Sequence, residues 1–150
     1  MFSSKLRSGM QQILSCEEQA VKAGAEFIAG SARQHHIPGS SGIRAVNEHI
    51  RESITAEVQR ESDGYFGKIS CKAAHGVYVE YGTGMVGAAS GGNGSGQHVT
   101  YTMREGWTYP VEGYNGTEFY YTEGQPAQPF MYPAFQEAKT QLLQIIAQNF

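Results

Sequence analysis

Histidine and serine are the residue types here that could support catalysis, and catalysis would require them at particular spacings. The five histidines form no HExxH or HxH pattern, and no Cys/His cluster has metal-ligand spacing. No serine lies in a G-x-S-x-G elbow. Glu48 and His49 are adjacent on a predicted helix and point apart, while His35-His36 ends a predicted helix, where a cation complements the dipole. We therefore expect no catalytic residue and no metal site.

Glycine is concentrated in one stretch, residues 82–97, which reads GTGMVGAASGGNGSGQ. It lacks the GxxxxGK[ST] pattern of a phosphate-binding loop, so we expect no nucleotide cofactor there. Such a composition buries little apolar area and predicts a mobile loop that orders on assembly. Its candidate interface residues are Met85, Val86, Asn93 and Gln97.

Composition bounds the class of protein. A length of 150 residues and a hydrophobic fraction of 40% fit one domain over residues 1–150. The net charge is −3 and the 11 Lys and Arg form no run, which argues against a nucleic-acid-binding surface. It does not exclude a channel lining past which DNA moves. No apolar run approaches the ~20 residues of a membrane span, and no signal-peptide pattern opens the chain, so we expect cytoplasmic synthesis.

Helical periodicity is strongest at the two ends of the chain. Residues 4–34 carry apolar side chains at three- and four-residue steps and predict one long helix. Its stripe packs either on the chain's own sheet or on a neighbouring subunit, and the sequence leaves both open. Ile43, Val46 and Ile50 share a face of a shorter second helix. A last helix is predicted to open at Pro133.

Between these helices the period changes to two. Strands are predicted at 54–59 and 65–71 around an Asp63-Gly64 turn. Further strands are predicted at 75–81, with a short helical turn as the alternative, and at 98–103, 107–111 and 117–122. The fold class is therefore α+β, with a long N-terminal helix, an antiparallel sheet of about four strands and a C-terminal helix.

Two segments carry a family resemblance, and a third segment supports it. Val79-Glu80-Tyr81-Gly82-Thr83 is similar to a "V-E-aromatic-G-T" element, and Pro129-Phe130 with Pro133-Ala134 is similar to "P-F-x-x-P-A" before a terminal helix. Arg51-Glu52-Ser53-Ile54 resembles part of "L-R-x-S-I". In this order they resemble the tail-completion, or head–tail joining, family of long-tailed phages, which is related to the lambda minor tail protein Z.

The resemblance implies a structural virion protein without cofactor or reaction. It implies a ring, commonly of six subunits, between the head connector or completion protein and the tail tube or terminator. DNA would only pass through its channel. Among the motif residues, Glu80 is a charge in an apolar stretch and needs a partner; we expect Arg51, with Arg44 second. Phe130 is expected to anchor the chain in the core.

The sequence is compatible with two other classes of function. The nine Tyr and the one Trp all lie between residues 65 and 132, and an aromatic sheet face could bind carbohydrate. A small hydrolase that uses a histidine and a carboxylate is the other alternative. The absence of any convergent catalytic motif ranks the hydrolase below both binding and assembly.

Overall fold

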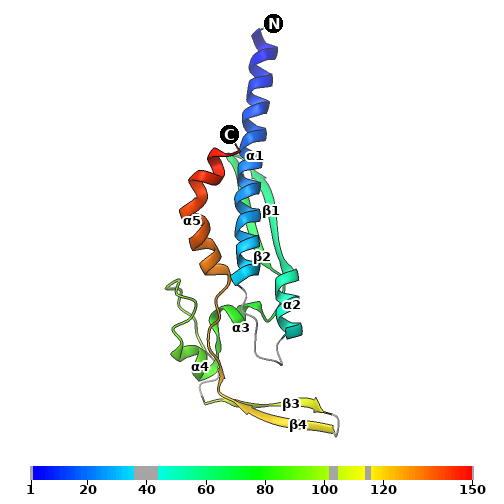
Figure 1. Cartoon of the computed structure of the whole chain (residues 1–150), viewed down its shortest axis with the longest axis vertical. Coiled ribbons are helices and arrows are strands. Elements are labelled where there is room, and N and C mark those ends of the chain that lie inside the picture. The colour runs from blue at the N-terminus through cyan, green and yellow to red at the C-terminus, as the bar shows by residue number, and fades with distance from the viewer. Residues whose placement is uncertain (1, 36–43, 102–104, 114–115, 150) are drawn as a thin grey trace.

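The chain folds into an elongated α+β structure with a long helix along its axis (Figure 1). The computed structural model describes residues 2–35, 44–101, 105–113 and 116–149. In chain order the elements are α1 (Phe2–His35), α2 (Arg44–Ser53), β1 (Ile54–Glu61), β2 (Gly64–Cys71), α3 (Gly76–Tyr81), α4 (Gly84–Ala89), β3 (Trp107–Gly113), β4 (Gly116–Thr122), β5 (Gly124–Gln125) and α5 (Met131–Ala147).

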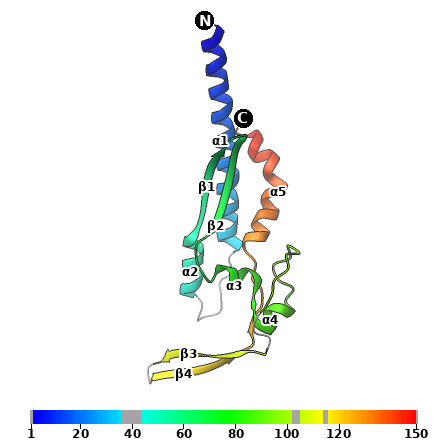
Figure 2. The same ribbon diagram turned by 180° about the vertical axis from the view of Figure 1, so that it is seen from behind.

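Helix α1 is the middle layer of the main body. The β1–β2 hairpin packs along one side of it and α5 along the other (Figures 1 and 2). The side chains that α1 and α5 bury are small, which lets α1 lie close to both layers. The buried alanines of these helices are Ala20, Ala25, Ala29, Ala32, Ala134 and Ala138.

The predicted α+β class, the two terminal helices and four of the strands are confirmed, but the strands do not form one sheet. β1 pairs with β2 and β3 pairs with β4, both antiparallel, as two separate hairpins. The first hairpin turns where Asp63-Gly64 predicted it. The second lies at the far end of the molecule and runs across its long axis (Figures 1 and 2).

Two of the predicted strands are wrong. The segment expected at 75–81 is helix α3, which is the alternative that the sequence left open. Gly76, Val79 and Glu80 are buried, and this spacing of three and four residues is helical. No strand occurs over residues 98–101 of the predicted 98–103 strand, and residues 102–103 lie outside the described residues.

The first part of α1 extends beyond the rest of the fold (Figures 1 and 2). The tip of the first hairpin, at Gly64, reaches only as far as Glu17. Leu6, Met10 and Ile13 before it are therefore 60–63% exposed. The predicted apolar stripe is thus divided: its later part lies within the fold, and its first part covers nothing within this subunit.

The core lies where α1, α2, α3 and the start of α5 meet. Its largest fully buried side chains are Phe130, Ile50 and Ile54. Phe130 is 1% exposed, so its predicted role as a core anchor is confirmed. It lies immediately before α5 and fixes the place where that helix begins.

We predict that Phe130→Ala lowers the free energy of unfolding by about 3–5 kcal/mol, because it removes a buried aromatic ring and leaves a cavity. Phe135→Ala is the matched control, since Phe135 is 53% exposed on the same helix. Urea denaturation of both variants measures the difference. Equal losses would contradict a core role for Phe130.

A carboxylate also links α1 to α5. The Ser31 hydroxyl donates a hydrogen bond to Glu137 Oε2, and His35 Nε2 lies 3.2 Å from the same oxygen. The hydrogen bond from Ser31, and then that from His35, lowers the pKa of Glu137 from its ordinary value of 4.5. A lowered pKa in the folded state means that the ionised form stabilises the fold.

This contribution is complete above the unfolded-state pKa and is lost as pH falls through the lowered folded-state value. Glu137→Gln should therefore destabilise the protein most at neutral pH, and the difference from wild type should shrink well below pH 4.5. Unfolding free energies measured across that range test this. A difference that does not change with pH would show that the carboxylate's charge is not involved.

Candidate functional site

The Glu80 carboxylate is the centre of the region that the two best motif segments build. It is 5% exposed and lies at the N-terminus of α5. The backbone N–H groups of Phe130 and Met131 donate to Oε2 at 2.8 and 2.9 Å. Oε1 accepts from the backbone N–H of Tyr132 at 3.0 Å and from the Asn93 side-chain amide at 2.9 Å. Sequence elements 50 residues apart are thus joined at one charge.

These four hydrogen bonds occupy the acceptor capacity of a carboxylate, which has about four lone-pair sites. The helix N-terminus adds a favourable partial positive charge. A group held in this way has no acceptor position left for a substrate proton. The geometry therefore assigns Glu80 a structural role.

The prediction that Arg51 pairs with Glu80 is wrong. Arg51 is exposed, and the hydrogen bonds that satisfy Glu80 come from α5 and Asn93. The side chain of Arg44, the second candidate, lies outside the described residues. Unpaired N–H groups at a helix N-terminus bind an anion as a cation would, which removes the need for an arginine.

The third motif segment joins α2 to the strands. The Ser53 hydroxyl donates to the Ile50 carbonyl at 2.8 Å and lies 3.2 Å from the Ala73 nitrogen, from which it accepts a hydrogen bond. Ile54, 1% exposed, is the first residue of β1 and part of the core. Ser53 and Ile54 therefore set the junction between α2 and the first hairpin.

The chain turns sharply after α3, at Gly82 and Thr83. Gly82 has φ +78°, and a Cβ atom there would lie 2.7 Å from both the Ala127 nitrogen and the Gln125 oxygen. The Thr83 hydroxyl accepts a hydrogen bond from the Gln125 backbone N–H at 3.2 Å. The expected sharp exit at Gly82 is confirmed, and close backbone packing explains the absence of a side chain.

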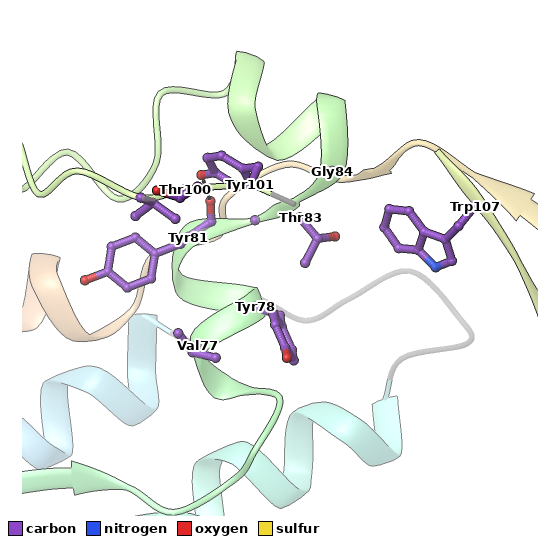
Figure 3. Close-up of a pocket in the computed structure, with 10 residues that line it drawn as sticks. Val77, Tyr78, Tyr81, Thr83, Gly84, Thr100, Tyr101 and Trp107 are labelled. Atoms are coloured by element: carbon purple, nitrogen blue, oxygen red, sulfur yellow. Dashed lines mark hydrogen bonds between the residues drawn. The ribbon is translucent and has the colours of Figure 1, made fainter. Parts of the chain in front are cut away.

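A pocket of about 500 Å³ lies beside this turn, between α3, residues 99–101 and the start of β3. Figure 3 shows Tyr78, Thr83 and Trp107 around the same space. Its lining is apolar or aromatic, with hydroxyls and no charged side chain: Val77, Tyr78, Tyr81, Gly82, Thr83, Gly84, Val99, Thr100, Tyr101 and Trp107. Such a surface suits an apolar side chain of a partner better than a charged small molecule.

The glycine-rich stretch is more structured than its composition indicates. Helix α4 forms within it, and Asn93 is buried against Glu80. Asn93 is therefore not available to a partner in this structure, unlike Met85, which is 45% exposed, and Gln97, which accepts a hydrogen bond from the Tyr81 hydroxyl at 2.7 Å. Val86 is half-buried. Mobility of this stretch before assembly stays a prediction.

Several groups that shape the site carry no signal in the sequence. The Tyr101 hydroxyl donates to the Tyr81 carbonyl at 2.7 Å and so closes the pocket on one side. Trp107 was assigned only to a strand, yet it also lines this pocket. Both contacts depend on how the chain returns to α3, which local periodicity does not encode.

Within the described ranges, no group of three or more His, Cys, Asp or Glu side chains gathers to hold a metal ion. Among the helices described, none is long and apolar enough to cross a membrane.

An uncharged pocket and exposed apolar surface at the ends of an elongated body are features typical of protein–protein interfaces. The family model described as "Bacteriophage HK97-gp10, putative tail-component" matches residues 4–82, just over half of the chain. The chain belongs to this HK97-gp10-like family of phage tail components, which is a structural class and not an enzyme class. The resemblance to a phage tail family that the sequence motifs indicated is thus confirmed. No curated protein and no solved structure matches the chain.

We predict that Glu80→Gln lowers the free energy of unfolding by about 3 kcal/mol, because the new amide NH₂ faces buried N–H donors that lose their acceptor. Glu57→Gln is the matched control, since the Glu57 carboxylate is exposed and its contact with Lys72 Nζ, at 3.8 Å, is on the surface. Chemical denaturation measures both. Losses of the same size in the two variants would contradict the capping role of Glu80.

Proposed function

We propose that this chain is the tail-completion subunit at the head–tail joint of a long-tailed phage. Copies assemble as a ring, of six by the family resemblance, between the head connector or completion protein and the tail tube or terminator. The ring gives the tail a docking surface and leaves an axial path for DNA. The chain is made in the host cytoplasm and ends in the neck of the virion.

Membership in the tail-component family is the observation that carries this proposal. The distribution of exposed apolar side chains supports it. A soluble monomer rarely leaves large contiguous apolar patches uncovered, and such patches mark protein interfaces. Those exposed on α1, on α5 and on the second hairpin are Leu6, Met10, Ile13, Tyr109, Val111, Phe119, Tyr120, Tyr121, Phe135, Leu142 and Leu143.

In this proposal the motif residues fix the subunit's own shape. Glu80, Gly82 and Phe130 set the angle between α3 and α5, and Ser53 sets the hairpin junction. Partner contacts fall on the exposed surface around the pocket, where Met85 and Gln97 lie near the end of α3. Family motif and interface are then different parts of the molecule.

The charge of the chain fits passage of DNA without capture. A net charge of −3, with 11 Lys and Arg spread through the sequence, provides no dense cationic surface. Phosphate binding grows with the number of neutralised phosphates. A channel lined by such subunits lets the genome move through without holding it.

Electron microscopy of phage produced without this protein tests the role. We expect full heads without tails, beside separate finished tails, because the joint is missing while both halves assemble. Supplying the intact gene in trans should restore joined particles. Normal infectious particles in its absence would refute the proposal.

A further inference from the structure

The projecting start of α1 is a basic apolar surface. Leu6, Met10 and Ile13 lie at i, i+4 and i+7, so they share one helix face, and each is at least 60% exposed. Lys5 and Arg7 are exposed beside them, and no acidic residue precedes Glu17. We name residues 2–15 the helical extension.

The β3–β4 hairpin at the opposite end has the complementary character. Phe119 and Tyr121 are 71% and 62% exposed on one face, and the rings of Tyr109 and Tyr120 lie tilted to each other on the other face, with centres 6.4 Å apart. The hairpin, residues 107–122, contains two Glu and no Lys or Arg. A two-stranded hairpin alone is marginally stable in water, so this one needs a partner against its faces.

The outer edge of β3 does not offer a regular place to add another strand. Pro110 lies opposite Phe119, three pairs from the Gly113–Gly116 pair nearest the turn. Proline has no N–H to donate to a ladder, and at this position its nitrogen faces away from β4. A partner is therefore expected to contact the aromatic side chains rather than extend the sheet along β3.

We propose that neighbouring copies in the ring are joined by the helical extension of one subunit packing on the β3–β4 hairpin of the next. Both surfaces are apolar and they are opposite in charge: Lys5 and Arg7 flank the apolar face of the extension, while the hairpin carries one carboxylate on each face, Glu112 on the face of Phe119 and Glu118 on the face of Tyr120. This inference rests on the proposed ring and names the contact that builds it.

The shape of the subunit supports a head-to-tail contact. The two surfaces lie at opposite ends of the long axis, so one copy does not bring its own extension to its own hairpin (Figures 1 and 2). A contact between two different patches generates a closed ring when the rotation between copies closes. The hairpin lies across the long axis of the subunit (Figures 1 and 2), so a helical extension that crosses it would not continue the axis of the first copy.

Charge reversal of the purified full-length chain tests the contact. Lys5→Glu with Arg7→Glu, and separately Glu112→Lys with Glu118→Lys, should each weaken self-association about tenfold or more, because on whichever face of the hairpin the extension packs, opposite charges become like charges. Combining all four substitutions should restore it. Lys22→Glu with Lys68→Glu is the control for the first pair, with the same change in net charge on exposed sites of the main body. Light scattering across a concentration series measures each variant.

Cross-linking locates the contact directly. In a background with Cys16→Ser and Cys71→Ser, copies carrying Met10→Cys and copies carrying Phe119→Cys should form mixed disulfide dimers on oxidation. Neither alone should. Dimers of Met10→Cys with itself would overturn the proposal in favour of helix–helix pairing.

The remaining outcomes separate this contact from the proposed function. Rings that form equally in every charge variant would overturn the contact and leave the ring intact. A wild-type chain that stays monomeric would also overturn it, while tailless heads in the deletion phage would still support a joint protein whose surfaces bind other virion proteins.

Discussion

The buried Glu80 carboxylate determines how the two halves of this chain are related. Its hydrogen bonds close a loop of about fifty residues, from the end of α3 to the start of α5, and the Gln128 N–H to Val79 carbonyl bond at 2.8 Å reinforces that closure. The residues between these bonds, which include the second hairpin and part of the pocket lining, are attached to the main body at these two points. A buried charge is costly unless every acceptor position is used. The carboxylate therefore tolerates one arrangement of its neighbours, and that arrangement sets the position of the pocket relative to the main body.

The sequence predicted the parts of the fold that local periodicity encodes. The length of α1, the Asp63-Gly64 turn and the terminal helix follow from apolar spacing and turn chemistry. It also indicated that Glu80 needs a partner, but not which one, because backbone N–H groups at a helix start have no residue identity. Asn93 contributes through its place in space, 13 residues away, with no motif to mark it. The α1 stripe led to a similar error of detail: its large side chains are half-buried or exposed, while alanines make the close contacts.

The family match ends at Gly82, where the chain leaves α3. The matched part contains α1, the first hairpin and the segment that carries Glu80, which together form most of the core. The unmatched part supplies α5, which completes that core, the second hairpin, and the lining of the pocket beyond Gly82.

At both projecting ends, the helical extension and the β3–β4 hairpin, we expect order to depend on assembly. The extension continues α1 but has no tertiary packing within the subunit, and most helical stability in proteins comes from packing of an amphipathic face. The second hairpin has the same difficulty, with aromatic side chains on two exposed faces. The main body, in contrast, is packed on both sides of α1 and holds its own core. Stability is therefore concentrated in the body, and the contact proposed between copies would join the two projections into one buried surface.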